Sequence, residues 1–172
     1  PVDCDPARPA GISATDAEHE LALARARAIR QHLRQQGWPE PLLADSGNGG
    51  HLLYRVDLPP ADDGQVARVL RGLAFLFDDE QVTVDETVAN PARIWKVYGT
   101  VARKGDDMPE RPHRLARLLE VPDMLVPVPR ELLGLKGDTF SFDFHWCDNP
   151  ADLKDPISLC INGDSAPNRR FY

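Results

Sequence analysis

The chain has 172 residues, a formal net charge of −7 and 42% hydrophobic residues. This length suits one ordinary domain, and the hydrophobic content is sufficient for a packed core, which argues against a disordered chain. No stretch approaches the roughly 18 apolar residues of a membrane span, and no basic-then-apolar segment of the secretory type opens the sequence. We therefore expect a cytoplasmic protein without a membrane partner. The three cysteines form no Cys-x-x-Cys pair, which argues against a thiolate zinc site.

The charge is unevenly distributed along the chain. Residues 93–117 hold seven basic and three acidic side chains, a local net charge of +4 in an acidic protein. A basic strip beside an acidic centre suits a site that holds phosphate and metal ions close together. A solvated loop of mixed charge explains the charges alone equally well.

The first 37 residues predict an extended start, a proline-rich loop and a helix. The helix begins near Thr15, because Thr15 and Glu18 have the spacing of a capping box, with Ser13 as a competing N-cap. The apolar residues that follow recur on one helical face. Gly37 ends the helix.

A hairpin is predicted next. Residues 42–44 favour a short strand, and the segment 46–50, Ser-Gly-Asn-Gly-Gly, favours a turn because its residues tolerate positive φ. Residues 51–58 alternate between apolar and polar side chains, which is typical of a half-buried strand.

A second helix is predicted over about 63–78 from apolar residues at i, i+3, i+4 and i+7. Residues 82–85 predict a short strand, with Asp85 on the side opposite its two valines. Residues 94–98 favour an extended or partly helical segment, and 117–121 a further strand.

The succession β-α-β-β-α-β over residues 1–85 is typical of a ferredoxin-like or RRM-like split β-α-β fold, so the expected class is α+β. The sequence then changes character. Residues 140–146 and 157–161 predict a C-terminal β-hairpin extension without helices. We therefore divide the chain into a domain over 1–133 and a β-rich tail over 134–172.

Three acidic residues are candidates for metal ligands. Asp3 and Asp5 are two residues apart, so a strand places both carboxylates on one face, where they could share divalent metal ions. Without a cation, such a close pair would repel. Asp85 adds a third acid at the end of a strand that the split pattern places in the same sheet. Each acid, taken alone, is more often a turn or cap residue.

The turn and the histidine after it are candidates for phosphate contacts. His51 lies on the acid-bearing side of its strand and could contact triphosphate oxygens, although a half-exposed strand histidine is an equally good interpretation. Ser46, Gly47 and Gly49 resemble a phosphate cradle only loosely, because a strand and not a helix follows them.

The basic strip supplies further candidates. Arg93, Lys96 and Lys104 could neutralise nucleotide or template phosphates, although any one of them is more often a surface charge. Trp95 and Tyr98 could stack on a base or sugar, but packing against apolar neighbours is the commoner role.

Taken together, these motifs resemble the catalytic domain of archaeo-eukaryotic primases, in particular the phage- and plasmid-type DNA primase–polymerases. Residues 3–18 resemble the family's first metal motif and its exit loop. Residues 45–54 are similar to its second motif, in which small residues precede a histidine. Residues 84–100 resemble its third, acidic motif and the basic strand that follows. The motifs follow one another in the family's order, and the resemblance covers roughly residues 1–133.

The resemblance implies a nucleotidyltransferase that uses Mg²⁺ or Mn²⁺ for template-directed addition of nucleotides, with release of pyrophosphate. It implies that Asp3, Asp5 and Asp85 are metal ligands. It also implies that His51 contacts the incoming nucleotide. The implied partners are a DNA template and primer, nucleoside triphosphates and, in many such proteins, a helicase or ATPase domain.

The sequence also departs from the family's pattern. The family has an α/β region before the first metal motif, so we expect this chain to be part of a longer protein. An aromatic residue is commoner at the position of Gly50, so we expect looser packing beside His51.

Two alternatives remain open at this point. One is a non-catalytic nucleotide- or nucleic-acid-binding remnant built on the same sheet. The other is a carbohydrate-associated β-module, because 142–149 and 162–172 faintly resemble the terminal strands of bacterial glycan-associated sandwich proteins. Metal-dependent nucleotide incorporation separates the first from an enzyme, and binding to glycans but not to nucleotides would favour the second.

Overall fold

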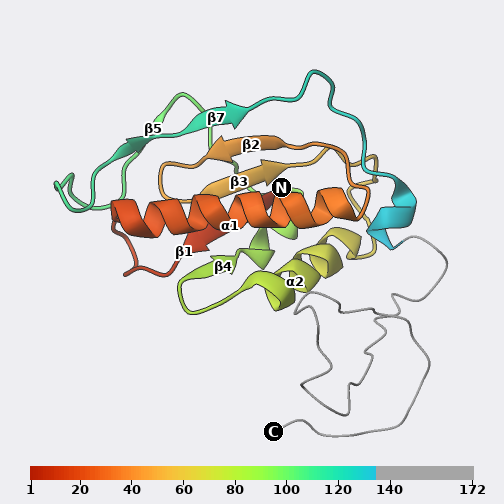
Figure 1. Ribbon diagram of the computed structural model, residues 1–172, viewed down its shortest axis with the longest axis horizontal. Helices are drawn as coiled ribbons and strands as arrows, with labels where there is room; N and C mark the ends of the chain where they lie inside the picture. Colours follow the sequence, from red (N-terminus) through yellow and green to blue (C-terminus); the bar gives the residue numbers. More distant parts are fainter. Residues whose placement is uncertain (135–172) are drawn as a thin grey trace, which may run out of the picture. The chain divides into compact units, whose positions relative to one another are not determined.

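A five-stranded antiparallel sheet with two α-helices on one of its faces forms the core of the described part of the chain, residues 1–134 of this computed structural model (Figure 1). The elements are, in chain order, β1 (Val2–Pro6), α1 (Asp16–Gln35), β2 (Leu42–Asp45), β3 (Gly50–Leu53), α2 (Gln65–Phe77), β4 (Val82–Val84), the 3₁₀ helix η1 (Glu86–Ala89), β5 (Val101–Ala102), β6 (Arg114–Leu115), β7 (Arg117–Glu120) and the 3₁₀ helix η2 (Arg130–Leu133). The expected α+β class is confirmed, and so is the succession β-α-β-β-α-β up to β4.

The strand order of the main sheet is β4-β1-β3-β2-β7. β3 lies between β1 and β2 and pairs antiparallel with both, so these two strands run in the same direction without touching. β4 pairs antiparallel with the other side of β1, and β7 pairs with the other side of β2. β1 is therefore a central strand, and any side chain on it has neighbours from two other strands.

β1 separates an apolar face of the sheet from an acidic one. Val2 and Cys4 are buried, whereas Asp3 and Asp5 between and after them are half-buried. Successive strand residues point to opposite faces, and α1 packs on the face that carries Val2 and Cys4. Asp3 and Asp5 therefore point to the face that the helices leave open.

The N-terminus of α1 is fixed by the predicted capping box. The Thr15 hydroxyl accepts a hydrogen bond from the Glu18 backbone N–H at 3.2 Å, and the Glu18 carboxylate accepts one from the Thr15 N–H at 2.8 Å. Ser13, the competing candidate, does not cap the helix, because its hydroxyl donates to the Lys104 carbonyl. Local sequence is sufficient to define this helix start.

Gly50 allows α1 to approach the sheet closely. A Cβ atom at Gly50 would lie 2.8 Å from the Cβ of Ala26 and 3.0 Å from the carbonyl oxygen of Ala22. The expectation of looser packing near His51 is therefore wrong. Gly50 is a contact point between α1 and the sheet, and His51, on the opposite face, is only 3% exposed.

The second strand of the hairpin is shorter than predicted. The alternation over 51–58 predicts eight strand residues, but β3 ends at Leu53. Its partner strands explain the difference, because β1 begins opposite Leu52 and β2 begins opposite Leu53. A strand needs a partner for its backbone groups, so alternation without a partner does not extend the sheet.

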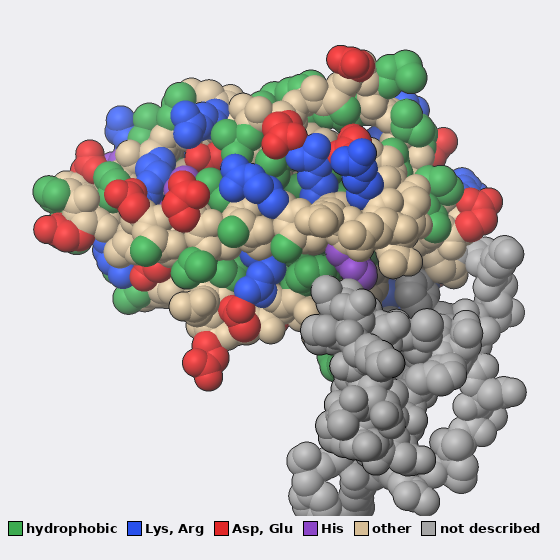
Figure 2. All heavy atoms as spheres, viewed as in Figure 1, with side chains coloured by type: hydrophobic (Ala, Val, Ile, Leu, Met, Phe, Trp, Pro, Cys, Tyr) green, Lys and Arg blue, Asp and Glu red, His purple; other side chains and the backbone are tan. Residues whose placement is uncertain are grey.

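The helix-covered face carries basic and acidic side chains side by side (Figure 2). Arg30 contacts Glu40 at 2.7 Å and Glu120 at 2.5 Å, and Arg34 contacts Glu40 at 3.3 Å. Exposed pairs of this kind contribute little to stability. They do place a carboxylate beside both Arg30 and Arg34.

Several expectations concern residues outside the described part. Residues 1–133 form a compact unit. The predicted tail over 134–172 lies outside the described residues except for Gly134, and so do its predicted strands over 140–146 and 157–161 and its likeness to glycan-associated proteins. The predicted domain boundary therefore stays a prediction. Within the described residues, neither α-helix combines the length and apolar character that a membrane span requires.

Candidate functional site

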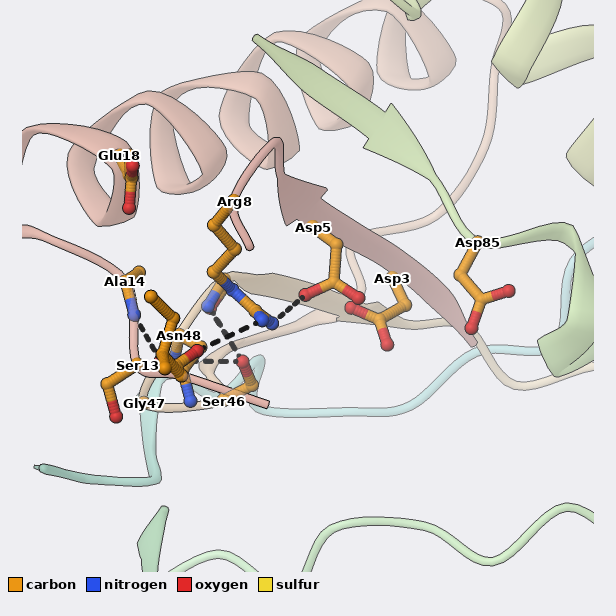
Figure 3. Close-up of polar contacts among 12 residues, drawn as sticks. Asp3, Asp5, Arg8, Ser13, Ala14, Glu18, Ser46, Gly47, Asn48 and Asp85 are labelled. Atoms are coloured by element: carbon orange, nitrogen blue, oxygen red, sulfur yellow. Dashed lines mark hydrogen bonds and ion pairs between the residues drawn. The ribbon is translucent and has the colours of Figure 1, made fainter. Parts of the chain in front are cut away.

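Asp3 stands between His51 and Asp85 in the sheet. It is paired with His51 on β3, and its carbonyl oxygen accepts a hydrogen bond of 2.9 Å from the Asp85 backbone N–H. Directly opposed residues on neighbouring strands point to the same face. Asp5 lies two residues further along β1 and shares this face. Figure 3 shows the carboxylates of Asp3, Asp5 and Asp85 side by side, as the strand pattern predicts.

One oxygen of the half-buried Asp3 carboxylate is itself buried and has no hydrogen-bond partner. The Oδ1 atom lies 3.2 Å from Nε2 of His51, but the angle is outside hydrogen-bonding geometry, and this oxygen accepts no hydrogen bond. Leaving a buried polar atom without a partner costs free energy. A function that requires this oxygen, such as binding a cation, would account for the arrangement.

The pKa of the Asp5 carboxyl is raised by burial and by the neighbouring acids. Burial raises the pKa of the Asp5 carboxyl, and the charges of Asp3 and, more weakly, Asp85 raise it further. Two cations oppose this change: Arg8, whose Nη2 lies 3.2 Å from Asp5 Oδ1, and Lys104. The three carboxylates are therefore close enough to repel one another, and a divalent cation among them would offset the repulsion.

The Asp85 carboxylate is engaged by its own neighbours. It caps η1, accepting hydrogen bonds from the Thr87 N–H at 2.9 Å and the Thr87 hydroxyl at 2.6 Å, and it lies 3.3 Å from the Arg93 guanidinium. Within residues 1–134, no group of three or more His, Cys, Asp or Glu side chains is arranged to hold a metal ion. Asp3 and Asp5 suit a hard divalent cation, and Asp85 would join them only by giving up contacts that it now makes.

A cavity of about 220 Å³ opens on the acid-bearing face. Seven of the predicted site residues line it: Asp3, Asp5, Ser46, His51, Arg93, Lys96 and Lys104. Asn48 and Arg103 also line the cavity and are not among the predicted residues; the position of Arg103 in the basic strip is the signal that could have identified it. Asp85 is outside the lining but contacts Arg93, which lines the cavity. Acids and cations thus face the same space, which suits a phosphate held beside a metal ion.

The turn between β2 and β3 uses its own side chains to satisfy its backbone. The Ser46 hydroxyl accepts hydrogen bonds from the N–H groups of Gly49 at 2.8 Å and Asn48 at 3.3 Å, and the Asp45 carboxylate accepts one from the Gly47 N–H at 2.6 Å. These donors are therefore not directed at a phosphate. Of the three residues predicted as a phosphate cradle, Ser46 lines the cavity, whereas Gly47 and Gly49 shape the turn.

Both glycines are required by close contacts. A Cβ atom at Gly49 would lie 2.2 Å from the carbonyl oxygen of Cys4 on β1. Gly47 has a φ of +89°, and a Cβ there would lie 2.6 Å from Ala102 and 2.8 Å from the Arg114 carbonyl oxygen. The turn can lie against β1 and the β5–β6 hairpin only because these positions lack side chains.

A buried pair that the sequence did not indicate holds the start of this turn. His19 Nε2 lies 2.8 Å from Asp45 Oδ1, and the two residues are 7% and 2% exposed. Burial pushes the pKa of Asp45 upward, but the hydrogen bonds from His19 and the Gly47 N–H outweigh it, so the pKa is lowered. His19 is spaced three and seven residues from Ala22 and Ala26 on the buried face of α1, and this spacing is the signal that could have identified it.

The aromatic residues of the basic strip pack around His51. Segment 94–98 is irregular and joins no sheet in the described residues. The Trp95 ring lies 4.4 Å and the Tyr98 ring 6.0 Å from the His51 ring, centroid to centroid. Trp95 also lines the cavity. Both aromatics therefore support the imidazole, whatever else they contact.

Comparisons with protein-family models, curated proteins and solved structures found no match for this chain. The chemistry of the cavity is therefore the basis for assigning a function. It combines two close carboxylates, a third acid beside them, an imidazole and four cations: Arg93, Lys96, Arg103 and Lys104.

Proposed function

We propose that this chain carries the catalytic centre of an archaeo-eukaryotic-type DNA primase–polymerase, a nucleotidyltransferase that extends DNA under the direction of a template. The supporting observation is that Asp3, Asp5 and His51, from two strands, line one cavity together with four basic residues of the segment after β4. The strand order β4-β1-β3-β2 with both α-helices on one face also agrees with the ferredoxin-like core that the resemblance implies.

Asp3 and Asp5 are the residues that would hold Mg²⁺ or Mn²⁺, with Asp85 as a third ligand. Such ions, when bound, activate the attacking hydroxyl and offset the charge of the leaving pyrophosphate. The unpartnered Asp3 oxygen and the raised pKa of Asp5 both support a cation at this position. Oxygen ligands without a thiolate suit these hard ions.

The basic residues of the cavity would bind the triphosphate. Lys96 and Lys104 would offset its charge, and His51 would contact a phosphate oxygen. Arg93 would have a second role, because it contacts Asp85 at 3.3 Å. A triphosphate that attracts Arg93 would release Asp85 toward Asp3 and Asp5, so nucleotide binding would help to complete the acidic site.

The proposed partners follow from this reaction. They are a DNA template with its primer and nucleoside triphosphates, in the replication of phage- or plasmid-like DNA. In a longer protein, a helicase or ATPase domain would accompany this one. The reaction takes place where DNA and nucleotides are present, and we therefore propose the cytoplasm as the compartment.

Extension of a labelled primer on a DNA template tests the proposal. We expect extension that requires Mg²⁺ or Mn²⁺ and falls by about a hundredfold or more in Asp3→Asn and in Asp85→Asn, while DNA binding is retained. Asp106→Asn is the matched control, because Asp106 is an exposed acid outside the cavity. Extension that neither Asp3→Asn nor Asp85→Asn reduces would exclude this site as the catalytic centre.

A non-catalytic nucleotide-binding module is the second candidate function. The observation in its favour is that the Asp85 carboxylate contacts Thr87 and Arg93. In the described residues, Asp3, Asp5 and Asp85 therefore do not form a group of three acids arranged to hold a metal ion. Such a module would bind nucleoside triphosphates through the basic residues of the cavity but would not extend a primer with any divalent ion. Binding without extension would therefore favour it over the enzyme.

A further inference from the structure

Tyr98 connects two side chains of the cavity wall through one oxygen atom. Its hydroxyl oxygen lies 3.1 Å from Nε1 of Trp95 and 2.8 Å from Nδ1 of His51. The His51 ring has its other nitrogen, Nε2, on the side of Asp3, 3.2 Å from Oδ1. The hydroxyl of Tyr98 thus faces the imidazole from the side opposite the acids.

The direction of the hydrogen bonds among Trp95, Tyr98 and His51 follows from which of these groups can donate and which can accept. An indole N–H can only donate, so the Tyr98 oxygen accepts from Trp95. If Nδ1 of His51 also donated to that oxygen, the Tyr98 hydrogen would have no acceptor among the contacts that this group makes in the described residues. A donor without an acceptor costs free energy where water does not reach it. Donation by the Tyr98 O–H to Nδ1 satisfies both the indole N–H and the phenol, and it places the His51 hydrogen on Nε2, beside the charge of Asp3.

Two further observations support this arrangement. Burial is the main reason that the pKa of Tyr98 is raised, so the phenol keeps its hydrogen at neutral pH. The carboxylate of Asp3 beside Nε2 also favours a hydrogen on that nitrogen. Both sides of the imidazole therefore select the same tautomer, with the hydrogen on Nε2.

Close packing surrounds the His51 ring. The residue is 3% exposed, and the Trp95 ring lies against it at a centroid distance of 4.4 Å and an interplanar angle of 41°. In this packed position Nδ1 lies beside the Tyr98 hydroxyl and Nε2 beside Asp3.

We propose that Tyr98 is a positioning residue that fixes His51 as the Nε2–H tautomer and directs this N–H into the cavity beside Asp3. The tautomer is a property of the free protein and does not depend on any reaction. Its consequence for catalysis rests on the proposed function: the Nε2–H donates to a phosphate oxygen of the incoming nucleotide, and Tyr98 acts on the reaction only through His51.

The tautomer is measured directly from the ¹⁵N chemical shifts of the His51 imidazole in the full chain, at a pH at which the ring is neutral. In the wild type we expect a protonated Nε2 and an unprotonated Nδ1. Tyr98→Phe removes the hydroxyl and keeps the ring, so we expect a mixture of tautomers. Tyr54→Phe is the matched control, because the Tyr54 hydroxyl is buried without a hydrogen-bond partner and lies outside the cavity. A wild-type Nδ1–H tautomer, or no change in Tyr98→Phe, would overturn the proposal.

Primer extension separates this proposal from the proposed function. In Tyr98→Phe we expect kcat to fall by about tenfold with little change in the KM for the nucleotide, and Tyr54→Phe to match the wild type. A Tyr98→Phe protein with the altered tautomer but an unchanged kcat would overturn the positioning role. If the wild type has the expected tautomer and does not extend primers, the fixed tautomer stands and the proposed polymerase activity fails. The amide spectrum of each variant, compared with that of the wild type, identifies any loss of folding.

Discussion

Asp3 is placed where its charge is costly for the fold. It is a central-strand residue with a carboxylate oxygen that is buried and accepts no hydrogen bond, and its charge raises the pKa of Asp5. An apolar residue at either position would avoid the desolvation and the repulsion. Acids that oppose folding in this way are typical of sites that bind cations or substrates, so these two residues are better explained by function than by stability.

Asp45 is the opposite case, a buried acid that supports the fold. Its lowered pKa means that the folded state favours the ionised form, so Asp45 contributes stability above the ordinary pKa of an aspartate, about 3.8, and this contribution is lost as the pH falls below that value. We expect Asp45→Asn to lower the free energy of unfolding by about 2 kcal/mol at pH 7, because charge-assisted hydrogen bonds to His19 and the Gly47 N–H are weakened.

Urea unfolding at several pH values measures this effect. The difference between wild type and Asp45→Asn should be largest at neutral pH and should shrink on acidification. Asp106→Asn is the control, because Asp106 is an exposed acid of the loop between β5 and β6 and should unfold as the wild type does. A difference that is absent at pH 7, or that grows on acidification, would contradict this assignment for Asp45.

At the scale of elements, the contact of α1 with β3 depends on Gly50. We expect Gly50→Ala to lower the free energy of unfolding by about 2 kcal/mol, because its Cβ would lie 2.8 Å from the Ala26 Cβ and 3.0 Å from a helix carbonyl oxygen. Chemical denaturation measures the loss. Ala26→Gly in the same chain removes one of the two clashes, so the double variant should be more stable than the sum of the single changes predicts. Strict additivity would mean that the two residues do not meet.

Elements that depend on local sequence were predictable, and those that depend on distant partners were less so. The start of α1 follows from Thr15 and Glu18, which lie within one turn of each other. The end of β3 at Leu53 is set instead by where β1 and β2 begin, which its own alternating sequence does not contain. The sequence predicts Gly50 as a turn residue, but it is the first residue of β3, and its contact with a helix more than twenty residues away was not predictable.

At the scale of the whole molecule, the strand order accounts for the part of the site that the sequence predicted. Period-two alternation places Asp3 and Asp5 on one face, and the split β-α-β order brings His51 and Asp85 to either side of Asp3. Side-chain pairing was not predictable, because the contact of Asp85 with Arg93 depends on the path of an irregular segment. That pairing decides whether the third acid is available to a cation.

The central claim is that Asp3 and Asp5 together hold a divalent cation, and a Mn²⁺ titration followed by the EPR signal of the free ion tests it most directly. We expect the wild type to bind Mn²⁺ and Asp3→Asn and Asp5→Asn each to weaken binding by about tenfold or more, because a charged oxygen ligand is lost. Asp106→Asn should bind as the wild type does. Equal Mn²⁺ binding by the wild type and by both site variants would contradict the claim.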